Sequence, residues 1–137
     1  MGAFELHKQL AADTEWVATL SLCRVLLMND SNYPWLILVP ERAGVREIHE
    51  LGHADQQTLM QEITAVSRIM ETAFDAHKMN VAALGNLVPQ LHVHVIARYV
   101  EDPAWPGPVW GRVPAAPYEA DIKKARVAHL RAHLNNL

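Results

Sequence analysis

The sequence predicts one α+β domain, in which strands joined by hairpins are combined with one long helix. Strand-like runs rich in apolar residues occupy residues 16–28, 35–39, 79–84 and 90–98. Between them, residues 55–77 carry apolar side chains at steps of three and four, which is the period of an amphipathic helix. Because these strands flank one long helix instead of alternating with several, a doubly wound parallel sheet is not expected.

Length and composition fit a single domain over residues 1–137. Half of the 137 residues (50%) are hydrophobic and 20% are charged, which is enough apolar material for one core. The formal charge of −3 argues against nucleic acid polymers and anionic membranes as partners, since both require a basic face. The chain start lacks the segments of a signal peptide, and no apolar run approaches the roughly 20 residues that cross a bilayer. A cytoplasmic location is therefore expected.

The first strand-like run breaks near its middle, so residues 16–28 suit either two strands or one bent strand. A polar turn at residues 29–32 connects this run to the strand 35–39. Cys23 lies inside the first run without a basic neighbour to activate its thiol, so it is expected to be a core residue. Met60 and Met70 of the long helix are likewise expected to fill gaps in the core.

The C-terminal part combines an irregular loop with a second helix. Residues 101–117 contain five prolines and are expected to form a long loop. Residues 118–134 return to a helical pattern and predict a C-terminal helix. Within the loop, Trp105 and Trp110 frame a Pro-Gly-Pro turn. Packing in the core or at a dimer contact is the favoured role for these two indoles, and stacking on a planar ligand is the alternative.

The strand at residues 90–98 alternates in polarity, so its two faces differ in chemistry. Gln90, His92 and His94 share one face. The other face is apolar and consists of Leu91, Val93 and Val95. Because the apolar face must pack on the long helix, the polar face is expected to point toward solvent or a ligand.

Three interpretations of the two imidazoles remain open on these residues alone. In the first, they are incidental surface residues. In the second, they share a metal ion, which requires a third ligand. His49 and His53 are the candidates for that ligand, but no feature of the neighbouring sequence brings either of them to the strand. The third interpretation is nucleophilic catalysis, in which a neutral imidazole attacks while its other nitrogen donates its proton to a fixed carbonyl. His92 would then attack, and His94 would donate to phosphate oxygens or to the leaving group.

The stretch GNLVPQLHVHVIAR, residues 85–98, resembles the signature of the histidine triad family, in which three histidines alternate with apolar residues and the middle one is the nucleophile. With the strands before the long helix, the resemblance extends over residues 16–98. It implies an antiparallel sheet of about five strands with the long helix packed across one face. It also implies a homodimer with active sites near the interface.

Carried over by position, the resemblance implies that His92 forms a nucleotidyl-histidine intermediate and that His94 contacts the scissile phosphate. Further polar residues stand at the family's amide and ribose positions and at the end of the motif, and these substrate-binding candidates are Asn86, Asn29, Asp30 and Arg98. For Asn29 and Asp30, ordinary turn chemistry is the alternative.

Three positions depart from the family pattern. Gln90 replaces the first histidine of the triad, Trp35 stands where many members have another histidine, and Ala97 replaces the usual proline. Gln90 stays among the catalytic candidates because its main-chain carbonyl, which any side chain preserves, is positioned to accept the ring proton of His92.

The implied reaction is hydrolysis at the α-phosphorus of a dinucleoside polyphosphate of the diadenosine tetraphosphate type, or of a nucleoside phosphoramidate. No bound cofactor or protein-held metal is expected, because a neutral imidazole is already a nucleophile at neutral pH. Mg²⁺ would accompany only a polyphosphate substrate. The alternative is a nucleotide-binding protein that has kept the pocket and lost turnover, and the substitution at Gln90 is the reason to consider it.

Overall fold

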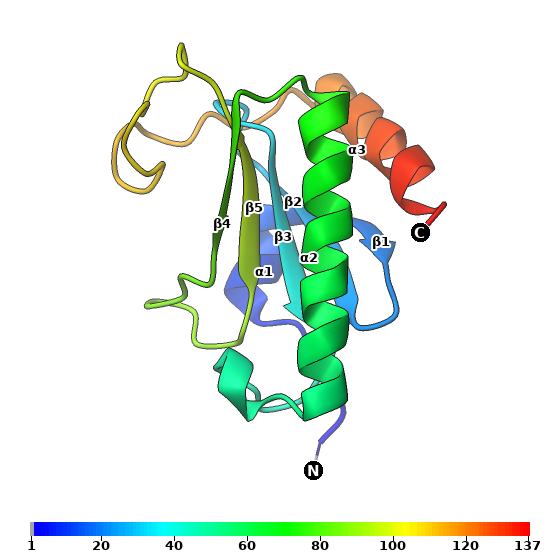
Figure 1. Ribbon diagram of the computed structural model, residues 1–137. Helices are drawn as coiled ribbons and strands as arrows, with labels where there is room; N and C mark the ends of the chain where they lie inside the picture. The colour runs from blue at the N-terminus through cyan, green and yellow to red at the C-terminus, as the bar shows by residue number, and fades with distance from the viewer. Residues whose placement is uncertain (1) are drawn as a thin grey trace.

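The protein is described by a computed structural model that covers residues 2–137. Its centre is one antiparallel five-stranded sheet with the strand order β1-β2-β3-β5-β4 (Figure 1). The strands are β1 (Thr14–Thr19), β2 (Cys23–Met28), β3 (Trp35–Pro40), β4 (Lys78–Ala82) and β5 (Val93–Arg98). The predicted α+β class and five-stranded antiparallel sheet are confirmed, and the first apolar run forms two strands.

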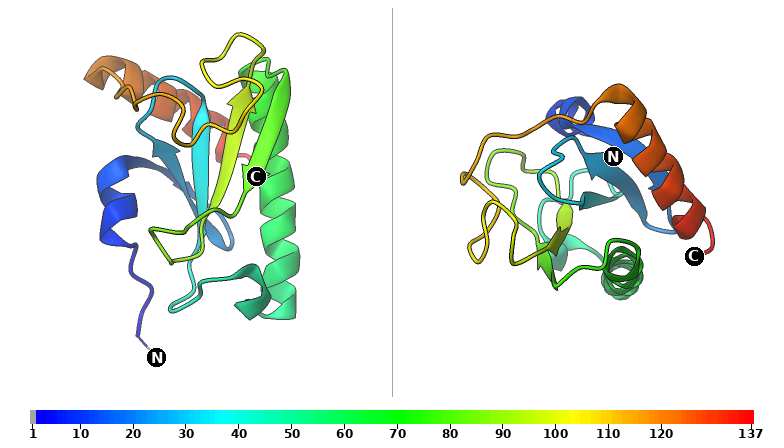
Figure 2. Two further views of the ribbon diagram at one scale, coloured as in Figure 1. Left: turned by 90° about the vertical axis from the view of Figure 1, so that its left-hand side faces the viewer. Right: turned by 90° about the horizontal axis from the view of Figure 1, so that it is seen from above.

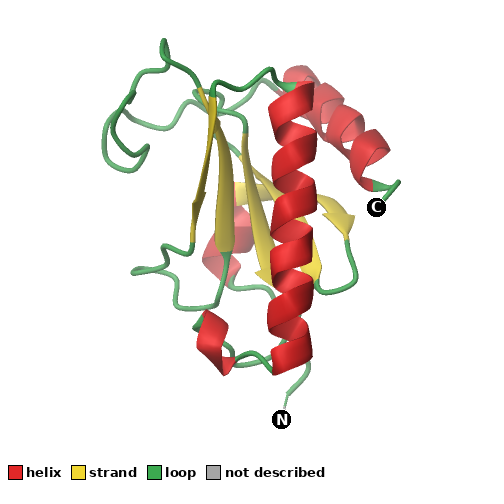
Figure 3. Cartoon of the chain, in the orientation of Figure 1, coloured by secondary structure: helices red, strands yellow, loops and turns green. Residues whose placement is uncertain are grey.

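Two longer helices cover one face of the sheet, and they are α2 (His53–Ala73) and α3 (Ala120–Leu134) (Figure 3). Both were predicted from sequence periodicity. The short helix α1 (Lys8–Asp13) and the 3₁₀ turn η1 (Ile48–Glu50) were not predicted. Within residues 2–137, no helix has the length and apolar character needed to span a membrane.

Helix α2 forms because its apolar side chains fall on one face, which packs against β5 and its neighbours. The buried apolar positions are Leu59, Ile63, Val66 and Met70. The chain leaves the helix at Asp75, which adopts a positive φ of 48°, a conformation that Asp tolerates better than most residues. The expectation for Met60 was wrong, because its side chain falls beside this stripe and is 61% exposed.

A buried carboxylate ties α2 to the β1–β2 hairpin. Glu62 of α2 accepts hydrogen bonds from the backbone N–H groups of Leu22, at 3.0 Å, and Cys23, at 2.9 Å. These bonds satisfy two backbone donors at a buried turn and explain why a charged residue is tolerated there. Cys23 is fully buried, as predicted. Its burial is the main reason that the pKa of its thiol is raised, and the negative charge of the nearby Glu62 carboxylate is the second.

The opposite face of the sheet is covered as well, which the sequence did not predict. The segment before α1 and the loop 101–117 lie over this face (Figure 2). Together with the outward side chains of β2, β3 and β5 they form a second apolar cluster, whose buried members are Leu10, Leu26, Tyr33, Trp35, Ile37, Val39, Ile96, Ala104 and Val109. The face of β5 that carries the histidines is therefore buried and not open to solvent.

Candidate active site

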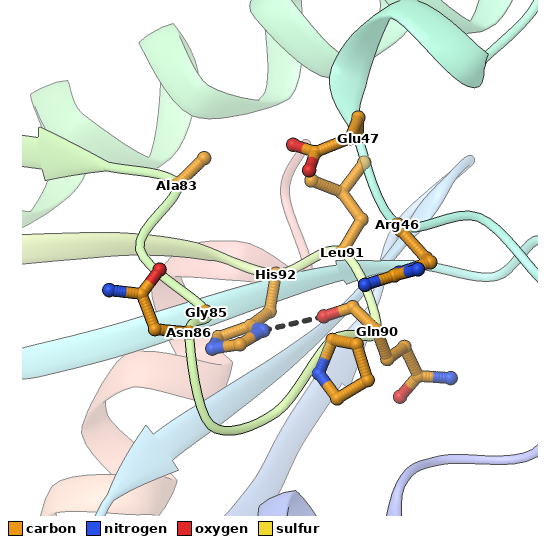
Figure 4. Close-up of a pocket in the computed structure, with 9 residues that line it drawn as sticks. Arg46, Glu47, Ala83, Gly85, Asn86, Gln90, Leu91 and His92 are labelled. Atoms are coloured by element: carbon orange, nitrogen blue, oxygen red, sulfur yellow. Dashed lines mark hydrogen bonds between the residues drawn. The ribbon is translucent and has the colours of Figure 1, made fainter.

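His92 lies immediately before β5 and is held by the main chain of Gln90. Its Nδ1–H donates a 2.7 Å hydrogen bond to the carbonyl oxygen of Gln90 (Figure 4). The sequence analysis expected the main-chain carbonyl of residue 90 to accept the ring proton of His92, and this hydrogen bond is confirmed. With the proton fixed on Nδ1, Nε2 carries the lone pair. Burial lowers the pKa of His92, against the opposing effect of the Gln90 bond, so the ring is neutral near pH 7.

Gly85 allows the loop before β5 to lie directly against the His92 ring. A Cβ atom at position 85 would come within 2.8 Å of Cε1 of His92 and 2.6 Å of the carbonyl oxygen of Val88. Both distances are too short for a carbon contact, so this close approach requires glycine. Gly85 of the motif thus supports the orientation of the imidazole.

His94 is buried, and both of its ring nitrogens are engaged by the protein. Nδ1 accepts a 3.0 Å hydrogen bond from the indole N–H of Trp35, and Nε2–H donates to the carbonyl oxygen of Leu84 at 2.9 Å. Trp110 packs edge-on to the ring, with centroids 5.0 Å apart. Burial, and then the neighbouring His92, lower the pKa of His94 to about 4. A neutral ring without a free N–H differs from the phosphate donor expected from the sequence.

The Gln90 side chain holds the segment before α1. Its Oε1 accepts a 2.9 Å hydrogen bond from the backbone N–H of His7, and its Nε2 donates to the carbonyl oxygen of Glu5 at 2.8 Å. The amide group therefore pairs with the main chain at two points. The side chain that replaces the first histidine of the triad acts on this segment, while its carbonyl acts on His92.

A polar cavity of about 100 Å³ lies beside the His92 ring. Its walls come from the loop before α2, from the loop after β4 and from the start of the histidine motif, and include Arg46, Ala83, Gly85, Asn86 and Gln90. In Figure 4, Asn86 lies next to His92 on the side away from Gln90, and the Arg46 guanidinium points into the cavity from the other side. Asn86 was a predicted substrate-binding residue. Arg46 was missed, because nothing in its local sequence links it to the motif.

Asn29 and Asp30 do not reach this cavity, so the structure does not support their ribose-binding role. The Asn29 side-chain oxygen accepts a 2.9 Å hydrogen bond from the backbone N–H of Tyr118. Asp30 is buried and accepts from the backbone N–H groups of Asn32 and Ala116. Both residues fasten the end of the loop 101–117 to the β2–β3 turn, which is the turn chemistry considered as their alternative.

Arg98 is likewise a structural residue, contrary to the sequence-based expectation. Its guanidinium is 1% exposed and forms a two-point ion pair with Asp102, at 2.8 and 3.0 Å. It also donates to Asn80 and to the carbonyl oxygen of Gly107. Burial alone would raise the pKa of Asp102, but hydrogen bonds from Arg98 and from backbone N–H groups lower it to about 2. The donors of Arg98 are committed to holding the loop.

The two indoles of the loop differ in what they touch. Trp110 contacts His94 and Trp35 at the rim of the second apolar cluster. Trp105 packs against His77, with ring centroids 5.3 Å apart, and under the Arg98 guanidinium. Packing is therefore the role that the structure gives to both.

The geometry does not assemble a metal site around the histidine pair. Among residues 2–137, no three His, Cys, Asp or Glu side chains are grouped so that they could hold a metal ion. The candidate third ligands are both exposed: His49 lies in the middle of η1, and His53 is the first residue of α2.

Comparisons with known proteins agree with the fold and the motif. The chain is 53% identical to a histidine triad protein from Marinobacter aquaeolei, with a TM-score of 0.96 over 99% of each chain. It is 45% identical to a histidine triad protein from Bradyrhizobium japonicum, with a TM-score of 0.93 over 96% of this chain and 98% of that one. No curated protein matches the chain.

A more distant likeness concerns the fold alone. The diadenosine triphosphate hydrolase of Plasmodium falciparum is 13% identical, with a TM-score of 0.63 over 97% of this chain and 83% of that one. Residues 9–101 match the HIT domain, and this span contains the sheet, α2 and the histidine motif. The chain therefore belongs to the histidine triad (HIT) family.

Proposed function

We propose that this protein cleaves a nucleotide at its α-phosphorus through a covalent intermediate on Nε2 of His92. The observation that carries the proposal is the 2.7 Å hydrogen bond from Nδ1–H to the Gln90 carbonyl, because it leaves the lone pair on Nε2. The lowered pKa of His92 supports the same role, since only the neutral ring can attack. Gln90 takes part through its main chain.

The proposed reaction has two displacements at phosphorus. In the first, the Nε2 lone pair forms an N–P bond while the bond from phosphorus to the leaving oxygen or nitrogen breaks, and its electron pair departs with that atom. In the second, water attacks phosphorus, the N–P bond breaks, and its electron pair returns to Nε2. The products are a nucleoside monophosphate and the protonated leaving group, and water supplies the net oxygen and protons.

The substrates we propose are dinucleoside polyphosphates and nucleoside phosphoramidates. The likeness in fold to a diadenosine triphosphate hydrolase supports the first class, and membership of the histidine triad family supports both. No protein-held cofactor is part of the proposal. Mg²⁺ is expected to arrive bound to the phosphates of a polyphosphate substrate, as part of that substrate, and titrating Mg²⁺ against both substrate classes tests this point.

The test is a single-turnover experiment followed by intact-protein mass measurement. Wild-type protein mixed with a limiting amount of substrate and quenched within one turnover is expected to gain the mass of a nucleotidyl group, and His92→Ala is expected to gain none. His133→Ala, which removes an exposed imidazole of α3, is the matched control and should form the adduct normally. Wild-type protein that binds nucleotide but neither forms an adduct nor releases product would instead support the alternative, a binding protein without turnover.

We also propose a homodimer formed through the edge strand β4. β4 has one hydrogen-bonded neighbour, β5, so its other edge is open to a second copy of the strand. Val81 is 47% exposed on this edge, and a groove of about 520 Å³ beside it is lined also by Ile48 and Met60. Sedimentation equilibrium is expected to give a dimer for the wild type and a monomer for Val81→Lys. A monomeric wild type at micromolar concentration would remove this proposal.

A cytoplasmic location is the remaining part of the proposal. Cys23 is the one cysteine of the chain and lies buried as a free thiol, so the fold uses no disulfide, as is usual in a reducing compartment. Cell fractionation with an antibody against the protein tests the location.

A further inference from the structure

His129 and His133 stand four residues apart on α3 and hold their imidazoles next to each other. In an α-helix, side chains at this spacing lie one above the other on the same face. Both residues are exposed, so an ion in solution can reach them. None of the residues that line the cavity beside His92 comes from α3, which packs at the β1 end of the sheet (Figure 1). The pair is therefore separate from the proposed reaction.

The two rings converge on their Nε2 atoms. These atoms are 3.2 Å apart, whereas the ring centroids are 4.9 Å apart. In a tetrahedral zinc site with Zn–N bonds of about 2.0–2.1 Å, two ligand nitrogens lie about 3.3–3.4 Å apart. The observed spacing is close to that of two imidazoles that share one ion, so chelation needs only a small adjustment of the two side chains.

Without an ion, the same contact is a hydrogen bond in which one neutral ring donates its Nε2–H to the other. That bond requires a different tautomer in each ring. An ion requires a lone pair on both Nε2 atoms, with the proton of each ring on Nδ1. Because both arrangements use the same ring positions, the hydrogen bond prearranges the pair for an ion.

The His129 ring is also held by its neighbours. Phe74 packs edge-on against it, with ring centroids 6.3 Å apart. The Arg126 guanidinium lies over the Phe74 ring, 4.7 Å from its centroid, and donates to the Tyr118 hydroxyl at 3.1 Å. A ring that is already held in place loses less side-chain freedom when it binds a ligand.

The donor set selects the class of ion. Imidazole nitrogens suit Cu²⁺, Ni²⁺ and Zn²⁺, whereas Mg²⁺ and Ca²⁺ prefer oxygen ligands. Within residues 2–137 no third His, Cys, Asp or Glu side chain completes a group with this pair, so water would fill the remaining positions. Arg126 and Arg131 of the same helix donate to the Tyr118 hydroxyl and to the carbonyl oxygen of Val17. Their positive charge opposes a cation, so an exchangeable ion is expected here and not a permanent structural centre.

We propose that His129 and His133 form a binding site for a divalent transition-metal ion, which the two Nε2 atoms and water hold. The ion would link the last two turns of α3, because the helix ends at Leu134. An ion that binds the folded helix more tightly than the unfolded chain raises the midpoint of thermal unfolding. The inference does not depend on the proposed function.

The first test is titration calorimetry of the full chain at pH 7.5. Wild-type protein is expected to bind one equivalent of Zn²⁺ at this pair, to bind Cu²⁺ more tightly, and to bind no Mg²⁺ there. His129→Ala and His133→Ala are each expected to weaken Zn²⁺ binding about 10- to 100-fold, because the second ligand of a chelate acts at a high effective concentration. His53→Ala, which removes an exposed imidazole at the start of α2, is the matched control and should leave the affinity unchanged.

The second test keeps the number of histidines and changes only their spacing. His129→Ala combined with Ala128→His places the two imidazoles five residues apart, on different sides of the helix. This variant is expected to bind Zn²⁺ as weakly as His129→Ala and to lose the rise in unfolding midpoint that Zn²⁺ gives the wild type. Electron paramagnetic resonance of bound Cu²⁺ should show two coordinating nitrogens in the wild type only.

Two results would overturn the inference. One is a wild-type protein that binds neither Zn²⁺ nor Cu²⁺ at millimolar concentration, which would show that the contact between the rings is a hydrogen bond alone. The other is equal affinity in the wild type and in the variant with shifted spacing, which would place the bound ion elsewhere on the protein.

Discussion

The indole N–H of Trp35 donates a 3.0 Å hydrogen bond to Nδ1 of His94, and the other nitrogen of that ring donates to the carbonyl oxygen of Leu84. This chain of contacts fixes His94 in one neutral tautomer and connects β3 to the loop that carries Gly85. The His94 ring also packs edge-on against the His92 ring, with centroids 4.9 Å apart, so it supports the candidate nucleophile both directly and through the loop at Gly85. His94 is thus a positioning residue in this structure.

Trp35→Phe removes the donor to His94 and keeps most of the aromatic packing. The Nδ1 lone pair then accepts a proton more readily, so the pKa of His94 is expected to rise above its value of about 4. We expect kcat to fall by about tenfold or less, as for the loss of one neutral hydrogen bond. NMR titration of the ring nitrogens checks the first expectation. Trp105→Phe, whose indole packs against His77, is the control, and a similar pKa rise in both variants would contradict the assignment.

Gly85→Ala should displace the His92 ring while leaving the sheet intact. The added Cβ would lie 2.8 Å from Cε1 of His92 and 2.6 Å from the carbonyl oxygen of Val88, so the ring or the loop must move. A displaced nucleophile is expected to cost about 100-fold in kcat. Gly52→Ala, where a Cβ meets nothing within 4 Å, is the control. Full activity in a folded Gly85→Ala protein would show that the close contact is dispensable.

Stability is expected to fall between pH 6.5 and pH 4.5. The pKa of His94 is about 4 in the folded protein and near ~6.5 when unfolded, so the unfolded chain binds the proton more tightly. The contribution of neutral His94 to the free energy of unfolding is therefore fully present above pH 6.5, and about 2–3 kcal/mol of it is lost as the pH falls toward the folded pKa. His92, whose pKa is also lowered, acts in the same direction.

Urea unfolding at pH 7.5 and 4.5 measures this difference. The paired carboxylate of Asp102, with a pKa of about 2, loses its stabilising effect only at lower pH. Backbone hydrogen bonds from Arg46 and Glu47 lower the pKa of Glu50, so this carboxylate adds a smaller loss at the acid end of the interval, and a histidine variant is needed to separate the two. His94→Asn should show a shallower decrease than the wild type over the same interval. An unchanged slope in that variant would argue against a neutral, buried His94.

Gln90→Ala is expected to keep a substantial fraction of kcat, because the carbonyl that holds His92 remains. The side chain holds Glu5 and His7, so its loss should mainly speed amide hydrogen exchange at His7. Gln90→Glu keeps the acceptor and loses the donor, so its rate of amide exchange at His7 should lie between those of the wild type and Gln90→Ala. His94→Ala is expected to reduce kcat/KM more than Gln90→Ala. If Gln90→Ala proves equally damaging on a folded protein, the glutamine side chain is a direct participant.

The sequence predicted the parts of the fold that depend on local periodicity. The spacing of apolar residues from Leu59 to Met70 is enough to predict helix α2. The alternation of polar and apolar residues around His92 is enough to predict that Val93 and Val95 pack against that helix. Helix α1 was missed because its six residues are stabilised by tertiary contacts, with Leu10 in the second apolar cluster.

The candidate site divides in the same way. The bond between His92 and the Gln90 carbonyl joins residues two positions apart and could be predicted, whereas the contact of His94 with Trp35 spans 59 positions. The expectation that the polar face of β5 is open was wrong. The segments that cover this face come from the two ends of the chain, far from β5 in the sequence. Arg46 could not be found from its neighbours in the sequence, because only the fold brings it to the cavity beside His92.

The amide of Gln90 pairs with main-chain atoms of Glu5 and His7, and not with their side chains. An interaction of this kind is indifferent to which amino acids occupy the held segment, provided that the backbone keeps its path. The exposed side chain at position 5 is therefore free to vary in evolution, or in the laboratory, without loosening the attachment, whereas Leu6 packs against the second apolar cluster. A small library at position 5 could be searched for altered substrate preference while the histidine motif stays untouched.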